Sequence, residues 1–288
     1  DAVIEKIKEL IPLAPLHNGA NLEGILLSRK KAPNVPQIAV FDTSFHSTMP
    51  KEAYLYALPY EMYEKHKIRR YGFHGTSHSF VMKEAAKEMK KSPKELNMIT
   101  LHLGNGSSAC AIKNGISVDT SMGFTPLEGL MMGTRCGDID PAIIIYLQRE
   151  AGFGVDDVDA LLNKRSGLLG VCGSIDLREI EKRDDELSKT AIEMMVRRVK
   201  KYIGSYMALL GGVDALVFTA GIGENSHTLR AKILQNLEVL GVELDEEANR
   251  QNALLISKES SRIKVFVIKT DEELEIARQS EEMLRKHE

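Results

Sequence analysis

The feature that most constrains the fold is a glycine turn between two β-prone runs, Met98–Leu103 and Ser107–Ile112. The apolar first run stops at Gly104-Asn105-Gly106 and a second run follows at once, which is the pattern of a tight β-hairpin. The turn carries almost no side chains, and glycine lets another group approach the backbone closely. Two interpretations are open: a plain hairpin, or a turn whose N–H groups and short polar side chains cradle a phosphate.

Apolar runs alternate with helical patterns along the rest of the chain, which indicates an α/β fold. Further strands are expected at Gln37–Phe41, Asp214–Thr219 and Ile263–Ile268. Helices are expected at about 1–10, 22–30, 76–90, 141–151, 155–163, 176–183, 186–210, 227–240 and 271–285. Thr76 or Ser77 is expected to cap the helix that runs to about residue 90.

Composition excludes several classes of protein. With 288 residues, of which 43% are hydrophobic, the chain is long enough for a large core and for two domains. The net charge of −3 and the lack of a basic block argue against nucleic acid or an anionic membrane as the main partner. Cys110, Cys136 and Cys172 show no Cys-x-x-Cys spacing, so we expect reduced thiols in a cytoplasmic protein. No apolar run reaches membrane-spanning length.

Three predicted strands end in residues that suit a ligand site. Asp42 follows Phe41, the Gly104 turn follows Leu103, and a second glycine loop follows Phe218. Ligands of open α/β sheets bind at the carboxyl ends of the strands, so these loops are expected to share one cleft. Asp42 is open to two interpretations, since an aspartate there either holds Mg²⁺ or caps a turn.

The second glycine loop, Gly221-Ile222-Gly223, opens a predicted helix whose free N–H groups favour an anion. It does not continue as Gly-x-Gly-x-x-Gly, because Asn225 and Ser226 follow, so a dinucleotide site is disfavoured. A Walker A lysine is also absent from the sequence.

His74 and Arg135 are both flanked by glycines, and each has two interpretations. His74 either reaches a ligand or satisfies a backbone carbonyl. Arg135 is either a guanidinium clamp for phosphate or carboxylate, or a member of a surface ion pair. Glu272 and Glu273 begin a predicted helix, where carboxylates suit the helix dipole. The remaining histidines near chain breaks show no convincing metal-ligand spacing; they are His17, His46, His78 and His102.

Taken together, these segments resemble the acetokinase family, which includes acetate and propionate kinases. The segments that carry the resemblance are spread in order along nearly the whole chain. They are Val40–His46, Arg70–His78, His102–Gly106, Asp119–Gly129, Gly133–Arg135 with Gly137-Asp138, and Phe218–Ser226. Two positions differ from the family pattern. Gly19 stands where the family usually has proline, and Cys172–Ile175 departs from the usual serine-rich loop.

The resemblance implies a duplicated ribonuclease-H-like fold, shared with sugar kinases, Hsp70 and actin, with ATP or ADP between two domains. It assigns Asp42 as the catalytic aspartate, His74 and Arg135 to transition-state stabilisation, and Glu272 to Mg²⁺. Its nucleotide-binding stretches correspond to His102, Leu103, Gly104, Asn105, Gly106, Asp176, Leu177, Arg178, Gly221, Ile222, Gly223, Glu224 and Asn225. His17 corresponds to a histidine near the active site.

The implied reaction is reversible phosphoryl transfer between ATP and acetate, in a homodimer. A carboxylate substrate is already ionised at neutral pH, so catalysis consists mainly of positioning and charge neutralisation. Propionate kinase is one alternative, because one methylene in an apolar pocket changes binding by only about 1–3 kcal/mol. A non-catalytic nucleotide-binding switch of the Hsp70 or actin class is another, although a switch needs neither Arg135 nor His74.

The resemblance also sets expectations for the domains. Residues 1–43 with 273–288 are expected to be a remnant of the N-terminal domain, and 44–272 the C-terminal nucleotide-binding domain. Family members carry a strand and a phosphate-facing turn, and later a second substrate-binding arginine, before the position that corresponds to Asp1. We therefore expect this polypeptide to be inactive alone.

Overall fold

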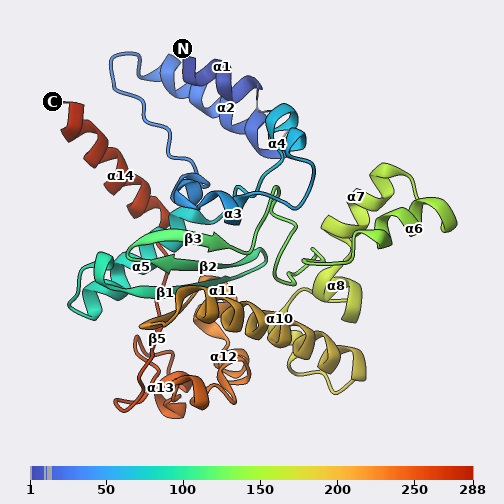
Figure 1. The fold of residues 1–288 in the computed structure, drawn as a ribbon, viewed down its shortest axis with the longest axis vertical. Helices are drawn as coiled ribbons and strands as arrows, with labels where there is room; N and C mark the ends of the chain where they lie inside the picture. The colour runs from blue at the N-terminus through green and yellow to red at the C-terminus, as the bar shows by residue number, and fades with distance from the viewer. Residues whose placement is uncertain (1, 10, 12–14, 288) are drawn as a thin grey trace. The chain divides into compact units, whose positions relative to one another are not determined.

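The computed structural model describes residues 2–9, 11 and 15–287 (Figure 1). The described residues form two compact units: residues up to Val40 with those from Gln279, and Phe41–Arg278. In the smaller unit, α1 (Ala2–Glu9) packs on α2 (Pro15–Lys31) through Ile4, Ile7 and Leu22. The assignment of nucleotide binding to the larger unit stays a prediction.

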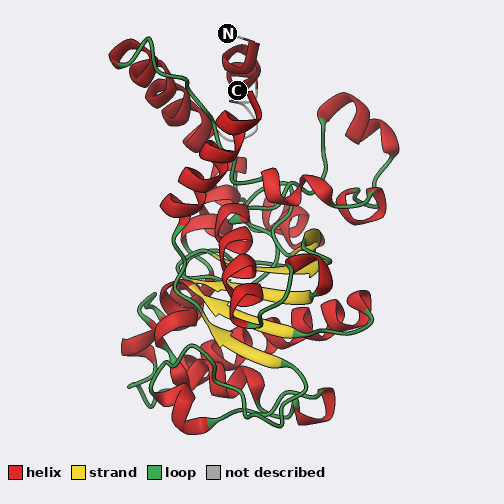
Figure 2. Cartoon of the chain, turned by 90° about the vertical axis from the view of Figure 1, so that its left-hand side faces the viewer, coloured by secondary structure: helices red, strands yellow, loops and turns green. Residues whose placement is uncertain are grey.

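The larger unit is built on one mixed sheet of five strands in the order β3-β2-β1-β4-β5 (Figure 2). The strands are β1 (Asn97–Leu103), β2 (Ser107–Lys113), β3 (Ile116–Thr120), β4 (Ala215–Thr219) and β5 (Lys264–Val267). β1, β4 and β5 run parallel to one another, whereas β2 pairs antiparallel with β1 and β3. The carboxyl ends of the three parallel strands therefore lie at one edge.

Helices cover both faces of this sheet (Figure 1). The helices of the larger unit are α3 (Lys51–Tyr54), α4 (Tyr60–His66), α5 (Gly75–Glu88), α6 (Ala142–Glu150), α7 (Val155–Lys164), α8 (Gly167–Cys172), α9 (Leu177–Ile180), α10 (Glu186–Leu210), α11 (Ala220–Asn225), α12 (His227–Leu234), α13 (Glu246–Arg250) and the start of α14 (Glu272–His287). Side chains alternate along β1, so that Met98 packs with α5 and Ile99 with α10. No helix in the described part of the chain is long and apolar enough to cross a membrane.

The glycine hairpin forms as the sequence predicts. β1 and β2 pair from Asn97 to Leu103, and the Gly104 N–H donates to the Gly106 carbonyl at 3.0 Å. The predicted strands near 214–219 and 263–268 are also present, as β4 and β5. The short strand β3 was not expected, because Ile116–Thr120 reads as the start of a glycine-rich segment.

The predicted strand Gln37–Phe41 is wrong. These residues are irregular, and the Phe41 side chain is 46% exposed. A strand needs a neighbour to accept its backbone hydrogen bonds, and the described residues offer none to this segment. The helix after Ser226 is shorter than predicted, since α12 ends at Leu234, and helix α11 forms where a loop was expected.

Candidate active site

Asp42 lies in a turn and is anchored to the start of α5. Its carboxylate accepts hydrogen bonds from the backbone N–H of His74 at 2.6 Å and of Thr76 at 3.3 Å. Its carbonyl accepts from the N–H of Gly75 at 2.9 Å, and a Cβ on Gly75 would lie 2.2 Å from that carbonyl oxygen. The predicted cap by Thr76 or Ser77 is therefore wrong, because Asp42 satisfies the free N–H groups from a distant part of the chain.

His74 takes the position before α5 in a left-handed backbone conformation, with φ 56°. Its ring stacks on that of His102, with centroids 4.0 Å apart and planes at 17°. Its Nδ1 lies 2.9 Å from the hydroxyl of Ser108, so this atom has a polar partner. Burial, together with the charge of Arg135, lowers the pKa of His74 to about 4, which makes the ring neutral at physiological pH.

Arg135 and His74 meet at the glycine turn. A Cβ on Gly106 would lie 3.4 Å from Nε2 of His74 and 3.5 Å from Nη1 of Arg135. Arg135 donates to the carbonyl of Pro126 at 3.1 Å, and burial lowers its pKa. No carboxylate of the described residues forms an ion pair with it, which argues against the surface ion-pair interpretation. A half-buried cation of this kind suits an anionic ligand.

The two glycine loops lie side by side at the carboxyl edge. His102 at the end of β1 pairs with Thr219 at the end of β4, and a Cβ on Gly104 would lie 3.6 Å from that of Ala220. Asn105 extends the turn towards Gly133, whose N–H donates to the Asn105 carbonyl at 3.2 Å. Gly221 has open space beside it, whereas Gly223 packs on β1.

The side chain of Glu224 holds the second loop. This carboxylate accepts from the N–H of Ala220 at 2.9 Å and from the N–H of Thr270 at 3.1 Å. Ala220 has a φ of 65°, a conformation that costs an alanine roughly 1–2 kcal/mol. The Asn225 amide donates to the Gly221 carbonyl at 2.8 Å. Strain of this kind persists where the surrounding structure enforces it, often in ligand-binding loops.

Glu272 begins α14, close enough to Asp42 for the two charges to interact. The pKa of Glu272 is raised by burial and by the negative charge of Asp42. Its position at the start of a helix also suits a carboxylate that only stabilises the helix dipole. The geometry therefore agrees both with this structural role and with a role in binding Mg²⁺. Two carboxylates that repel each other at one edge of a sheet are oxygen ligands suited to a divalent cation.

Asp176 and Arg178 bond to each other and not to the described residues around His74. The Arg178 guanidinium donates to the Asp176 carboxylate at 2.9 and 2.6 Å, and Asp176 caps α9. The same segment reaches the second glycine loop through Glu181, which accepts from Ser226 at 2.9 Å. Three other predicted residues have side chains that pack in or against the core, so only their backbone groups are available to a ligand: Leu103, Leu177 and Ile222. The side chain of His17 lies outside the described part of the structure.

Sequence reasoning missed residues that support this site. Arg230 is fully buried and donates to the carbonyls of Gly223 and Glu224 at 2.8 and 3.0 Å. Ser108 contacts Nδ1 of His74, and His78 contacts Ser108 in turn. His78 is one helical turn after His74, a spacing that signals a shared face. Nothing in the sequence around Arg230 signals its contact with the loop.

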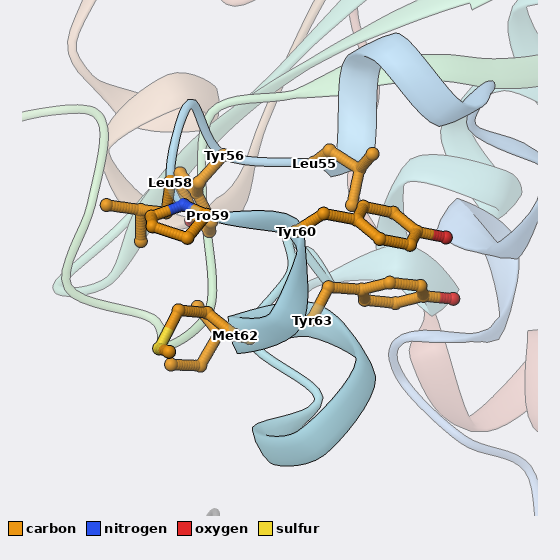
Figure 3. Close-up of a pocket in the computed structure, with 8 residues that line it drawn as sticks. Leu55, Tyr56, Leu58, Pro59, Tyr60, Met62 and Tyr63 are labelled. Atoms are coloured by element: carbon orange, nitrogen blue, oxygen red, sulfur yellow. The ribbon is translucent and has the colours of Figure 1, made fainter.

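The small cavity in Figure 3 lies elsewhere. It holds about 60 Å³, and it is lined by Leu55, Tyr56, Leu58, Pro59, Tyr60, Met62, Tyr63 and Ile68. Pockets for small molecules usually measure about 300–1,000 Å³. This cavity is therefore too small for a nucleotide, and none of the predicted site residues lines it.

Two glycine loops at the carboxyl edge of an α/β sheet, beside a cation that pairs with no carboxylate of the described residues, are typical of the class of phosphotransferases. Comparison with known proteins narrows the class. Residues 1–278 match the model of the Acetokinase family, and the chain belongs to that family. It is accordingly a phosphotransferase with a carboxyl group as acceptor, and its fold is the α/β fold of acetate kinases.

Individual proteins of this family are similar to the chain over nearly its whole length. The chain is 72% identical over 283 residues to the acetate kinase of Sulfurimonas denitrificans, covering 98% of this chain and 73% of that protein. The crystal structure of Porphyromonas gingivalis acetate kinase superposes with a TM-score of 0.95 at 48% identity, covering 98% of this chain and 73% of that one. A propionate kinase from Francisella tularensis gives a TM-score of 0.90 at 48% identity, with 95% and 71% covered. The family match favours an enzyme over a non-catalytic switch.

Proposed function

We propose that this protein transfers a phosphoryl group reversibly between ATP and acetate, giving acetyl phosphate and ADP. The observation that carries the proposal is the meeting of Nε2 of His74 and Nη1 of Arg135 beside Gly106. Two donors that face one point, at the end of a phosphate-type loop, suit the negative oxygens of a phosphoryl group in transfer.

The roles of the residues follow from the charges involved. Acetate needs no general base, because its carboxylate is ionised at neutral pH. The obstacle is repulsion between two anions, which Arg135 and the N–H groups of the glycine loops reduce. Asp42, anchored by the N–H groups of His74 and Thr76, orients the reacting groups rather than removing a proton. The loops at His102–Gly106 and Gly221–Asn225 would hold the nucleotide, with Asp176–Arg178 at their margin.

The carboxylates of Asp42 and Glu272 would hold Mg²⁺ together with the nucleotide phosphates. Mg²⁺ in kinases is usually bound by one or two carboxylates plus phosphate oxygens, so two protein ligands are sufficient. The raised pKa of Glu272 fits such a site, since burial and the negative charge of Asp42 both disfavour its ionised form until a cation binds. When bound, the ion would neutralise charge on the phosphates.

Replacing Glu272 tests the metal role. We expect Glu272→Gln to raise the Mg²⁺ concentration for half-maximal activity by about tenfold or more, because one carboxylate ligand is lost. Glu273→Gln is the matched control, since Glu273 is exposed at the next position of the same helix turn. The measurement is a Mg²⁺ titration of initial rate, and equal titration curves for both variants would contradict the role.

Acetyl phosphate formation tests the function itself. The protein expressed from its whole gene is given ATP and acetate, propionate or butyrate, and acyl phosphate is trapped as the hydroxamate. We expect the highest kcat/KM with acetate. A higher value with propionate would favour the alternative substrate, and no product with any of the three would contradict the proposal. The expectation that these 288 residues alone are inactive stays a prediction.

A homodimer is proposed as the assembly. Helix α6 exposes Ile143, Ile145 and Tyr146 by 44%, 49% and 64%, and the helix has no buried residue. An exposed apolar face of this kind is typical of a protein interface. Light scattering that gives a monomer mass would contradict it. A cytoplasmic location is proposed because Cys110, Cys136 and Cys172 are all free thiols.

A further inference from the structure

Behind His74 lies a chain of buried polar side chains with no assigned role. Nδ1 of His74 is 2.9 Å from the Ser108 hydroxyl, which is 2.7 Å from Nε2 of His78. Nδ1 of His78 is in turn 2.7 Å from the Thr100 hydroxyl. Thr100, His78 and Ser108 are fully buried between α5 and the sheet. Such groups are retained in a core only when they are hydrogen-bonded.

This chain has two possible directions. A hydroxyl and a neutral imidazole each donate one proton, so the direction chosen at one end is passed to the other. In the first direction, Thr100 donates to His78, His78 to Ser108, and Ser108 to Nδ1 of His74. His74 then carries its own proton on Nε2. In the second direction every bond is reversed, and Nε2 of His74 is left with a lone pair.

Thr100 decides between the two directions. The contact with His78 is the one hydrogen bond that its hydroxyl makes within the described structure. In the second direction Thr100 accepts from His78, and its own proton is buried without an acceptor. Leaving a buried donor unsatisfied disfavours that arrangement by roughly tenfold to a hundredfold. In the first direction every proton of the chain has an acceptor except the one on Nε2 of His74, which faces the glycine turn.

His102, on which His74 stacks, has a chain of the same direction. Thr270 donates to the Ser77 hydroxyl at 2.9 Å, and Ser77 lies 2.8 Å from Nδ1 of His102. If Ser77 also accepted from Nδ1 of His102, its own proton would have no acceptor among the hydrogen bonds of the described residues, so this proton is directed to Nδ1 of His102. The two stacked rings thus share one tautomer.

We propose that Thr100, His78 and Ser108 are positioning residues that hold His74 as the Nε2–H tautomer, so that it presents a donor to the transferred phosphoryl group. The donor role of His74 towards a phosphoryl group rests on the proposed function. The assignment of the His74 tautomer does not, because it follows from the hydrogen bonds alone. A lone pair on Nε2 would repel an anionic oxygen, whereas an N–H stabilises it. The stacking on His102 keeps the ring plane in place while the chain selects the proton position.

Nitrogen NMR tests the tautomer directly. The protein expressed from its whole gene is labelled with ¹⁵N-histidine, and ring nitrogens are recorded at pH 7.5 without nucleotide. Protonated and unprotonated ring nitrogens have well-separated shifts. We expect the proton on Nε2 and not on Nδ1 in both His74 and His78. A proton on Nδ1 of His74 would overturn the proposal.

Variants of Thr100 test the cause. Thr100→Val keeps the shape but removes the hydroxyl that sets the direction, so we expect a mixture of His74 tautomers and a several-fold lower kcat at unchanged KM for ATP. Thr100→Ser should restore both the single tautomer and kcat. Thr120→Val is the matched control, because Thr120 is a buried strand threonine bonded to the Ala109 carbonyl outside this chain. A single Nε2–H tautomer in Thr100→Val would contradict the role of Thr100.

The outcomes also separate the two proposals. If the unmodified protein shows the expected tautomer but forms no acyl phosphate, the proposed function fails and the polar chain stands. If it forms acyl phosphate while His74 carries its proton on Nδ1, the polar chain fails and the function stands.

Discussion

The surroundings of Arg135 make this residue suited to bind an anion. The guanidinium is half-buried, and its donors reach one backbone carbonyl and the Met132 sulfur, with no carboxylate of the described residues in reach. Burial of a cation without a countercharge is unfavourable, which is why its pKa is lowered. A phosphate or carboxylate bound there would relieve this cost, and the relief would contribute to the affinity for the anion.

Removing Arg135 is expected to affect turnover more than folding. Arg135→Ala should lower kcat by about 10²–10³, as the loss of a transition-state donor does in other enzymes. Arg262→Ala is the matched control, because Arg262 is exposed and likewise donates to one backbone carbonyl, that of Leu240. Steady-state rates of acetyl phosphate formation decide the matter. A fall in kcat of less than threefold in Arg135→Ala would argue against the assigned role.

Gly106 is predicted to matter for access rather than for conformation. A Cβ there would make ordinary contacts with His74 and Arg135, and the residue is not in the left-handed region. Gly106→Ala should therefore fold normally, while its methyl fills the space that both side chains face. We expect a fall in kcat/KM of at least tenfold at unchanged melting temperature. Gly204→Ala, in open space on α10, is the control. Full activity in Gly106→Ala would show that no ligand atom lies there.

At the scale of elements, the candidate site is built from short segments that are stabilised by contacts with other segments rather than by their own hydrogen bonds. Helix α11 has six residues and begins at the strained Ala220. Glu224 bonds its first N–H group, and Arg230 on α12 bonds its last carbonyls. A cation at a helix carboxyl end and an acceptor at its amino end both stabilise the helix. The loop shape is thus imposed by its neighbours.

Arg230 is the residue that contributes most to holding α11 in place. Arg230→Met should lower the free energy of unfolding by about 3 kcal/mol or more, because the buried carbonyls of Gly223, Glu224 and Asn249 lose their donor. KM for ATP should rise as the loop loosens. Arg250→Met is the control, since that arginine is exposed and its ion-pair partner in the described part of the chain is Glu247. Urea unfolding measures the first effect, and matched midpoints for the two variants would refute it.

At the scale of the whole molecule, buried neutral histidines link stability to pH. Burial lowers the pKa of His46 to about 4 and that of His102 to about 3, and it holds the pKa of His78 well below its ordinary value. In the unfolded chain histidine titrates near 6.5. Below that pH the unfolded state binds protons that the native state does not, so unfolding becomes more favourable.

Stability is therefore expected to fall as the pH drops from about 6.5 towards 4, and to be nearly independent of these histidines above 7. The loss by pH 5 should be about 2 kcal/mol for each buried histidine. Urea midpoints at pH 5, 6, 7 and 8 measure it. His46→Gln, where it folds, should show a smaller loss between pH 7 and 5. Equal midpoints at pH 5 and 7 would contradict the linkage.

Local patterns in the sequence were sufficient for the hairpin, for strands β4 and β5, for most helices and for the glycine loops. Hairpins and amphipathic helices are encoded by residues close together in the chain, so periodicity and turn residues reveal them. The same reasoning grouped Asp42, the Gly104 turn and the second glycine loop at one edge, although the strand expected before Asp42 does not form.

Contacts between distant residues were decided by the tertiary structure alone. Asp42 caps a helix that begins 33 residues later in the numbering, at Gly75, and no local pattern announces that bond. The burial of the Arg135 guanidinium, the hydrogen bonds of Arg230 to α11 and the polar chain next to His74 each depend on which groups the fold buries together. Hydrogen-bond partners and desolvation are properties of neighbours in space, and the sequence lists only neighbours along the chain.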